Sequence, residues 1–354
     1  MNRYCIIMAG GIGSRFWPLS KADRPKQFLD ILGTGKTFLR ATFERFRPLV
    51  EPDRFVVVTN AAYRQLVLDQ LPEIGVSQVL CEPVRRNTAP CIAYAMSHIL
   101  ARSPEAAVAV TPADHLVSNE PEFHRVIGMG FDFVERQQDA LMTIGIRPTR
   151  PETGYGYIEV GESGKAGIVP VASFKEKPDL DTARRFLADG RYLWNSGIFL
   201  WSSRAIMQAL LTHLPALMAL FDEGRHCFGT PAEQDFIDRQ FSRCEDISID
   251  YGVMEHHDSR YTVAADFGWS DIGTWGSLYT HAAHDGQGNA VSGKVLLVGS
   301  TGCVVNVEEG YEAIVEGLDR YLVALRDRSL LVCRMDDEQK IKEWVKECGN
   351  AGVR

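Results

Sequence analysis

The N-terminal half of the chain alternates between short apolar runs and longer stretches of helical character, and this alternation restricts the fold more than any other feature. The apolar runs are continuous or rich in β-branched residues, as buried strands are. They cover residues 4–8, 55–59, 78–81, 106–111 and 141–144, and the helical stretches between them cover residues 38–49, 61–71, 89–101 and 121–137. Strands and helices that alternate through short connections predict an α/β fold with a parallel, doubly wound sheet.

A glycine-rich loop follows the first of these strands, at the edge where ligands bind in such sheets. It reads Ala9-Gly10-Gly11-Ile12-Gly13-Ser14-Arg15, and Lys26 follows in a Pro-Lys pair. Glycines let backbone N–H groups come close to phosphate oxygens, and Arg15 and Lys26 add fixed positive charge. The loop therefore predicts a phosphate-binding site, with an ordinary strand-to-helix turn as the alternative.

Two other phosphate-binding loops fit this chain poorly. The dinucleotide loop needs a third glycine at the position of Phe16, where a large side chain would prevent close helix–strand packing. The loop of kinases and GTPases is imitated at its end by Gly35-Lys36-Thr37, but Asp30 stands where its first glycine belongs. We therefore interpret Lys36 as a solvated loop lysine.

Size and composition exclude several classes of protein. A chain of 354 residues can hold one large catalytic domain and a small appendage. Its net charge of −8 argues against a general role on nucleic acids or membrane surfaces. No apolar run reaches the length of a membrane span, and the N-terminus lacks the layout of a signal peptide. The eight cysteines include no Cys-x-x-Cys pair, so we expect a cytoplasmic protein with reduced thiols.

The character of the sequence changes near residue 287, where we place a domain boundary between residues 1–286 and residues 287–354. Short strands at close spacing follow, and they are expected at 295–298, 303–307, 313–315, 321–325 and 330–333. A final helix over 337–348 places apolar side chains on one face, namely Ile341, Trp344, Val345 and Cys348. That face must be covered by its own domain or by a second subunit, and we favour a homodimer.

Two aspartates, far apart in the sequence, are candidate metal ligands. Asp114 comes just after a central strand, and Asp271 lies between aromatic residues and glycines. Magnesium binds few protein carboxylates and completes its octahedron with phosphate oxygens and water. Two carboxylates and a phosphate loop therefore favour Mg²⁺-dependent phosphoryl or nucleotidyl transfer. For Asp114 alone, a turn or a helix cap is the alternative.

Three further segments carry polar groups that suit a nucleoside or a sugar. Residues 82–90 include Glu82, Asn87 and Thr88, which could contact a nucleobase, although Asn87 and Thr88 could equally cap the following helix. Lys175 and Lys177 flank Glu176 at a strand end, for which a charged edge strand is the alternative. The segment 195–199 could hold a sugar hydroxyl or form a simple turn.

Taken together, the motifs resemble those of the sugar-nucleotide pyrophosphorylases, and within that family the mannose-1-phosphate guanylyltransferases. They occur in the family's order over nearly the whole chain, at residues 10–20, 25–28, 86–90, 112–115, 154–158, 174–178, 195–199, 248–251 and 269–271. The glycine loop and the Pro-Lys pair mark the broad family. The Asn-Thr-Ala-Pro and Pro-Ala-Asp-His segments point to the GDP-mannose branch, while Lys175 stands where a more apolar residue is expected.

The resemblance implies a Rossmann-like nucleotidyltransferase domain with a mixed, mainly parallel sheet, followed by a short left-handed β-helix that often makes dimer contacts. The implied reaction joins GTP and mannose 1-phosphate to give GDP-mannose and diphosphate, with Mg²⁺ required. No general base is needed, because a sugar-phosphate oxygen is already ionised at neutral pH.

The resemblance also implies a role for each candidate residue. The implied catalytic residues are Arg15, Lys26, Asp114 and Asp271, of which Asp114 and Asp271 would hold the metal. The nucleotide would be bound by Ala9, Gly10, Gly11, Gly13, Ser14, Glu82, Asn87 and Thr88, and the sugar phosphate by Gly156, Glu176, Lys177 and Asn195. A nucleotidyltransferase for another sugar phosphate and a non-catalytic nucleotide-sugar sensor are the alternatives.

Overall fold

The structure is a computed structural model that describes residues 1–11, 13–161 and 167–350, with only the backbone for residues 14, 349 and 350. The chain forms two compact units. The first unit comprises Met1–Gly10, Thr42–Ala113 and Val117–Trp269, and the second comprises Gly11–Ala41, Asp114–Leu116 and Ser270–Arg354. This division groups residues by contact and crosses the sequence several times, so the domain boundary near residue 287 stays a prediction.

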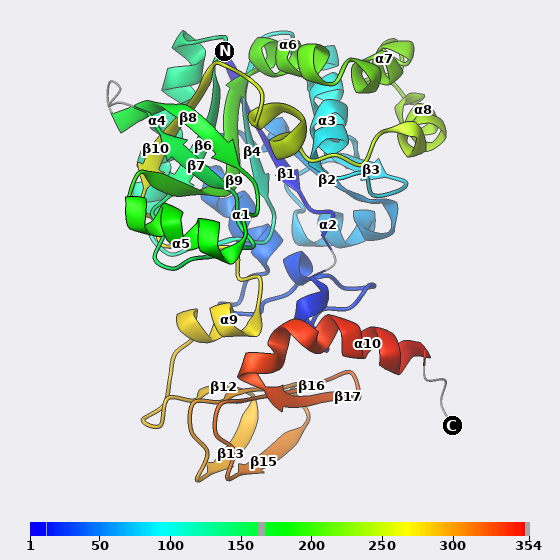
Figure 1. The fold of residues 1–354 in the computed structure, drawn as a ribbon. Helices are drawn as coiled ribbons and strands as arrows, with labels where there is room; N and C mark the ends of the chain where they lie inside the picture. Colours follow the sequence, from blue (N-terminus) through cyan, green and yellow to red (C-terminus); the bar gives the residue numbers. More distant parts are fainter. Residues whose placement is uncertain (12, 162–166, 351–354) are drawn as a thin grey trace. The chain divides into compact units, whose positions relative to one another are not determined.

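The first unit is built on a sheet that has nine strands within the described residues, in the order β3-β2-β1-β4-β9-β6-β10-β8-β7 (Figure 1). These strands are β1 (Asn2–Met8), β2 (Phe55–Asn60), β3 (Val79–Glu82), β4 (Ala106–Pro112), β6 (Leu141–Ile146), β7 (Tyr157–Val160), β8 (Ile168–Lys175), β9 (Tyr192–Ser202) and β10 (Arg260–Ala265). The predicted α/β fold is therefore confirmed, and each of the five expected N-terminal strands forms.

The sheet is parallel in one half only. Strands β3, β2, β1 and β4 pair in parallel, as expected from the strand–helix alternation. Beyond β4, strand β9 runs antiparallel to β4 and β6, and β7 and β8 form an antiparallel pair. A mainly parallel sheet is thus a correct prediction for the first half and a wrong one for the second.

Helices cover the sheet because its central strands are buried on both faces. These helices are α1 (Phe38–Phe46), α2 (Arg64–Gln70), α3 (Thr88–Arg102), α4 (Glu120–Arg136), α5 (Leu180–Asp189), α6 (Ser203–His213), α7 (Pro215–Glu223) and α8 (Glu233–Gln240). The apolar face of α3 packs with Ile6, Val108 and Val110 in one core cluster that also includes α6. Helix α4 packs against β4, β6 and β9 without joining that cluster, and so it covers the other face.

The stretch at 205–217 was expected to be one helix, but the structure breaks it into α6 and α7 at Leu214. Pro215 begins α7, and a proline has no N–H to continue the preceding helix. No single helix among the described residues is long and apolar enough to cross a membrane. Helices α6 and α7 satisfy the same length and composition criteria only as a joined pair, which is bent by 114°.

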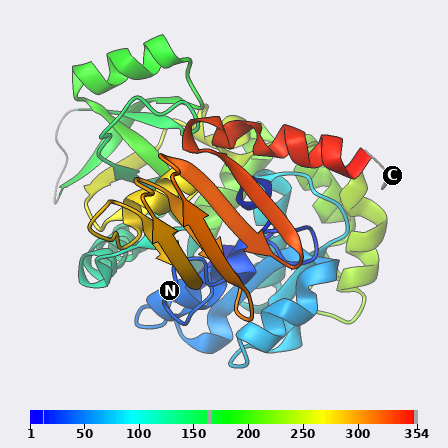
Figure 2. The ribbon, with the colours of Figure 1, turned by 90° about the horizontal axis from the view of Figure 1, so that it is seen from below.

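The second unit contains two small sheets and three helical segments besides the N-terminal loop. Its elements are α9 (Trp275–His281), β12 (Ala290–Ser292), β13 (Lys294–Val298), β14 (Val304–Val307), β15 (Glu312–Glu316), β16 (Tyr321–Arg326), β17 (Ser329–Arg334), a 3-10 segment (Met335–Lys340) and α10 (Ile341–Asn350); β5 (Leu116–Val117) and β11 (Trp269–Ser270) lie at the junctions of the two units. One sheet has the order β12-β14-β16-β17, and the other consists of β13 and β15 (Figure 2).

The parallel pairings in this unit share one register. Lys294 pairs with Glu312, Val304 with Leu322, and Thr301 bridges Asp319, so each partner lies 18 residues further along the chain. Apolar side chains from both sheets fill the space between them, and they include Cys303, Val305, Val307, Val315 and Val323. The chain therefore winds in coils of constant length around a small core. Strand β17 ends this stack by pairing antiparallel with β16.

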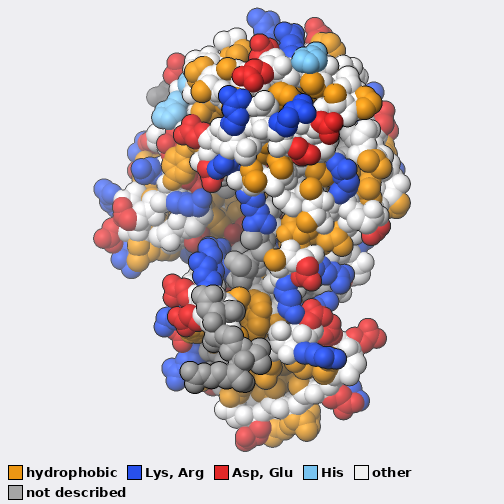
Figure 3. Space-filling view, turned by 90° about the vertical axis from the view of Figure 1, so that its right-hand side faces the viewer, with side chains coloured by type: hydrophobic (Ala, Val, Ile, Leu, Met, Phe, Trp, Pro, Cys, Tyr) orange, Lys and Arg blue, Asp and Glu red, His pale blue; other side chains and the backbone are white. Residues whose placement is uncertain are grey.

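The opposite face of the larger sheet packs on a second core, which contains Phe16, Trp275 and Ile341. Helix α10 begins at Ile341, and Val345 lies against the same core. Trp344 is 36% exposed and Cys348 is exposed, so only half of the predicted apolar face of this helix is covered. On the smaller sheet, Leu296, Val298 and Ile314 point outward and are exposed. Hydrophobic side chains gather at that end of the second unit (Figure 3).

Candidate functional site

The phosphate loop begins where β1 ends. In the first unit, the backbone N–H of Ala9 donates to the carbonyl oxygen of Val58 at 2.8 Å, which holds the end of β1 beside β2. In the second unit, Gly13 has a φ of 63° and caps the 3-10 turn Ser14–Phe16. A Cβ on Gly13 would lie 2.6 Å from the Cβ of Lys26, so both conformation and space require glycine here. Ile12 and the side chain of Ser14 lie outside the described part of the chain.

Lys26 joins the two candidate metal aspartates within the second unit. Its ammonium donates to the backbone oxygen of Asp271 at 2.5 Å and lies 3.1 Å from Oδ2 of Asp114. The residue is only 3% exposed, and its charge also lies 5.0 Å from the centre of the Phe38 ring. A charge so deeply buried needs a partner, and Asp114 supplies it. Three of the four predicted catalytic residues therefore meet at one point, whereas the fourth, Arg15, is exposed.

The electrostatics of this cluster keep Asp114 ionised. Burial alone would raise the pKa of Asp114, but the charges of Lys26 and His115 outweigh burial and hold the pKa below its ordinary value. Asp271 is fixed locally, since its Oδ1 accepts a hydrogen bond from the backbone N–H of Gly273 at 3.0 Å. Two carboxylates thus flank the end of Lys26, one through its side chain and one through its backbone.

The donor set of this cluster fits a hard divalent cation. Among the described residues no group of three or more His, Cys, Asp and Glu side chains could hold a metal ion by themselves. Asp114 and Asp271 alone could bind Mg²⁺ only if substrate oxygens and water completed the shell, which is how magnesium sites at phosphates are commonly built. The pair suits a metal that arrives with a phosphate ligand.

Unusual backbone conformations mark three of the predicted segments. Positive φ angles in residues other than glycine are uncommon, and they persist only where the surroundings enforce them. Asn87 has a φ of 66°, Lys177 of 43° and Ile272 of 41°. The first two are candidate site residues and the third follows Asp271. Such strain is characteristic of positions where a side chain must face a ligand.

Glu82 ends β3 and is buried, with only 7% of its surface exposed. Its Oε1 has no hydrogen-bond partner among the described residues, and its Oε2 lies 3.7 Å from where a Cβ on Gly10 would be. Burial raises the pKa of Glu82 to about 8, against the opposing effects of the Cys91 thiol and of Arg85. A carboxyl group buried beside the start of the phosphate loop with an unused oxygen is a candidate acceptor for a ligand.

The other two nucleobase candidates make the helix-capping contacts that were the alternative. The side-chain oxygen of Asn87 accepts from the backbone N–H of Thr88 at 3.0 Å, at the start of α3. The hydroxyl oxygen of Thr88 accepts from the backbone N–H of Ile249 at 2.8 Å. Both contacts hold the start of α3, and a role in nucleotide binding stays a prediction for these two residues.

The four sugar-phosphate candidates lie together in the first unit. A Cβ on Gly156 would lie 2.4 Å from Oε2 of Glu176 and 3.4 Å from the Cβ of Asn195, so the bare backbone of Gly156 makes room for both. The ammonium of Lys177 lies 2.8 Å from Oε1 of Glu176. The side-chain amide of Asn195 donates to Oδ1 of Asp250 at 2.8 Å.

The sequence reasoning missed Asp250 and Thr143 as members of this cluster. Asp250 lies in the segment 248–251 that was noted among the family-like motifs, but no role was given to it. Thr143 donates to Oδ1 of Asn195 at 2.8 Å from within the buried strand β6. No local signal in the sequence distinguishes it from an ordinary strand threonine.

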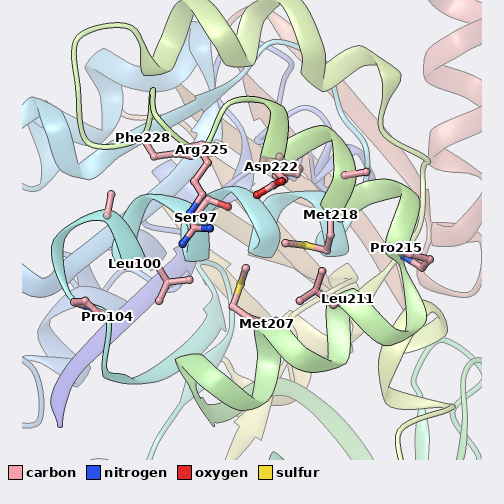
Figure 4. Close-up of a pocket in the computed structure, with 13 residues that line it drawn as sticks. Ser97, Leu100, Pro104, Met207, Leu211, Pro215, Met218, Asp222, Arg225 and Phe228 are labelled. Atoms are coloured by element: carbon pink, nitrogen blue, oxygen red, sulfur yellow. The ribbon is translucent and has the colours of Figure 1, made fainter.

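A cavity of about 770 Å³ in the first unit lies apart from all these residues (Figure 4). It is lined by α3, α6 and α7, with apolar side chains such as Leu100, Met207 and Met218 and the charged Asp222 and Arg225. None of the predicted site residues lines it. The candidate site is therefore defined by its charges and buried polar groups rather than by this cavity.

Comparison with known proteins agrees with this chemistry. The family model for nucleotidyl transferase matches residues 4–288. The chain belongs to the nucleotidyl transferase family. It is 36% identical to the mannose-1-phosphate guanylyltransferase of Escherichia coli (strain K12), in an alignment that covers 98% of this chain and 74% of the relative. It is 38% identical to the xanthan biosynthesis protein XanB of Xanthomonas campestris pv. campestris (strain B100), over 98% of this chain and 73% of the relative.

A solved nucleotidyl transferase structure extends the match to three dimensions. The crystal structure described as a mannose-1-phosphate geranyltransferase from Thermus thermophilus is 31% identical, with a TM-score of 0.87. It covers 99% of this chain, and this chain covers all of it. The resemblance drawn from the motifs is thereby confirmed at the level of the family and of the whole fold.

Proposed function

We propose that this nucleotidyl transferase is a mannose-1-phosphate guanylyltransferase, which joins GTP and mannose 1-phosphate to form GDP-mannose and diphosphate. The observation that carries the proposal is the junction at Lys26, where a buried cation meets Asp114 and the backbone of Asp271 immediately after a phosphate loop. The names of the relatives supply the substrates. The product would serve the synthesis of polysaccharides and glycoconjugates.

The catalytic step is an in-line displacement at the α-phosphorus of GTP. An ionised oxygen of the sugar phosphate attacks, the new P–O bond forms, and the bond to the leaving diphosphate breaks, so no general base is required. The backbone N–H groups of residues 9–14 would hold the triphosphate, and Arg15 and Lys26 would compensate the charge of the leaving group. Catalysis then consists of alignment and electrostatic stabilisation.

Asp114 and Asp271 would hold the Mg²⁺ ion in this mechanism. The bound ion would draw charge from the phosphate oxygens and fix their orientation. Lys26 keeps both aspartates in place from the protein side, because it bonds the carboxylate of one and the main chain of the other. This arrangement leaves Asp114 ionised and ready for a cation at neutral pH.

The two substrates would be recognised in the first unit. Glu82, with Asn87 and Thr88, would contact guanine, whose ring N–H and amino groups are donors that suit a carboxylate acceptor. Gly156, Glu176 and Asn195 would hold the mannose, and Lys177 would bind its phosphate. The exposed ammonium of Lys177 at a strand end is suited to an anion that enters from solvent.

The tail would form a short left-handed β-helix in a homodimer. The constant register of 18 residues in its parallel strands supports a coiled β-structure. The exposed apolar side chains of Leu296, Val298 and Ile314 supply a surface that a second copy could cover. The eight cysteines are free, which supports a cytoplasmic protein with reduced thiols.

A diphosphate-release assay with purified protein tests the proposal. We expect turnover with GTP and mannose 1-phosphate in the presence of Mg²⁺, and much slower turnover when dTTP and glucose 1-phosphate replace them. If the second pair were used faster than the first, the substrate assignment would be wrong, although the nucleotidyl transfer chemistry would stand.

A further inference from the structure

One buried carboxyl group beside the sugar-phosphate candidates has no part in the proposed mechanism. Asp250 begins a short π-helical turn, Asp250–Met254, and such turns occur frequently at functional sites. Its Oδ1 accepts a hydrogen bond from the side-chain amide of Asn195. Among the described residues, no side chain donates to its other oxygen.

The contacts of Asn195 determine which way its amide faces. Its Oδ1 accepts from the hydroxyl of Thr143 at 2.8 Å and from the backbone N–H of Gly197 at 3.2 Å. The oxygen is thus satisfied by two donors, and the NH₂ group must face Asp250. One of its two N–H bonds is used there, which leaves the other for a ligand. Asp250 and Asn195 together present an acceptor beside a donor.

The charged groups around Asp250 come from two elements. Glu176 and Lys177 follow the end of β8, and Tyr251 and Glu255 belong to or follow the turn that Asp250 begins. Burial, and then the negative charge of Glu176, raise the pKa of Asp250 to about 7, while the bond from Asn195 and the charge of Lys177 act in the opposite direction. A carboxyl group kept at this cost, among the sugar-phosphate candidates, needs a purpose beyond local structure.

We propose that Asp250 binds the hexose ring directly, by accepting a hydrogen bond from one ring hydroxyl while Asn195 donates to its neighbour. A vicinal diol offers a donor and an acceptor side by side, which is the complement of this carboxylate–amide pair. The bare backbone of Gly156, against which Glu176 and Asn195 both lie, leaves room for the ring. The inference rests on the proposed function, because it takes a hexose 1-phosphate as the substrate.

The test compares wild type and Asp250→Asn on mannose 1-phosphate and on its 2-, 3-, 4- and 6-deoxy analogues. We expect Asp250→Asn to raise the KM for mannose 1-phosphate by about 10- to 100-fold, the loss of one hydrogen bond to a charged group. The KM for GTP should stay within about twofold, because no contact to the nucleotide is lost. Wild type should use one deoxy analogue poorly, and the variant should use that analogue about as well as mannose 1-phosphate. Asp246→Asn, an exposed carboxylate on the same segment, is the matched control.

A merely structural Asp250 would lower activity by the same factor on every analogue, and that result would overturn the inference. A second measurement needs no variant. In wild type, the preference for mannose 1-phosphate over the critical deoxy analogue should rise with pH through about 7, because Asp250 accepts best when ionised. The ratio cancels the titration of the phosphate that both substrates share. A ratio independent of pH would also count against Asp250. Wild type inactive on GTP and mannose 1-phosphate would refute the proposed function itself.

Discussion

Replacing Glu82 by Gln should stabilise the protein while weakening its binding of GTP. The carboxyl group is buried, and one of its oxygens lacks a partner among the described residues. Glutamine has nearly the same shape and cannot ionise. The free energy of unfolding should therefore rise wherever the wild-type carboxyl is under electrostatic stress, and the KM for GTP should rise because the candidate acceptor for guanine loses its charge.

The pH dependence of this effect follows from the two pKa values of Glu82. The unfolded side chain ionises near its ordinary pKa of 4.5, and the folded one stays protonated up to about 8. Between these values the unfolded state binds fewer protons than the folded state, so the free energy of unfolding of wild type falls as pH rises. At about 1.4 kcal/mol per pH unit, the penalty grows from roughly 1 kcal/mol at pH 5 to roughly 3 kcal/mol at pH 7.

Urea unfolding followed by tryptophan fluorescence at pH 5, 6, 7 and 8 would measure this difference. The gain of Glu82→Gln over wild type should increase steadily over that range. Glu122→Gln is a control of opposite sign, because Arg125 lowers the pKa of the exposed Glu122 carboxyl, so the neutral variant should lose stability at neutral pH. A gain for Glu82→Gln that is equal at pH 5 and pH 7 would refute the reasoning.

Three further predictions concern the metal cluster and the tail. Asp114→Asn and Asp271→Asn should each lower kcat by about 10²–10³, but only Asp114→Asn should also lower the denaturation midpoint clearly, since it leaves the buried charge of Lys26 without its carboxylate while the backbone contact of Asp271 survives; equal midpoints would contradict this. Chelation with EDTA should abolish diphosphate release and Mg²⁺ should restore it; activity that persists in EDTA would exclude a metal requirement. Gly293→Ala should destabilise the tail, as seen by a lowered thermal midpoint, because its φ is 97° and a Cβ would lie 2.1 Å from the carbonyl oxygen of Val307; an unchanged midpoint would argue against that geometry.

The first half of the sheet could be predicted because its signals are local. Continuous apolar runs separated by amphipathic stretches indicate strands that are covered on both faces, and β1 to β4 form accordingly. Strand β9 was missed for a physical reason. The segment 195–199, with its Asn, Ser and Gly, could be interpreted as a turn, yet it lies inside this strand, where Gly197 takes a φ of 71° at an irregularity in the pairing with β6.

The types of residue in the site could also be anticipated, whereas their contacts could not. A lysine in a Pro-Lys pair and two aspartates beside turns suggest phosphate and metal chemistry. That Lys26 would bond the carboxylate of Asp114 but the backbone of Asp271 depends on folding segments that are far apart in the sequence. The partnership of Thr143, Asn195 and Asp250 is likewise a product of tertiary structure, since each comes from a different element.

The repeated register of the C-terminal strands makes the length of that region a discrete quantity. Each coil stacks on the one before it through the same offset, so an inserted or deleted segment keeps the stacking only if it contains a whole coil of 18 residues. A change of any other length would bring inward side chains to the outside, as a slip of register does in any sheet. Evolution or a protein engineer can therefore lengthen this end of the molecule in fixed steps, as with other repeat structures, and leave the chemistry of the nucleotidyl transferase untouched.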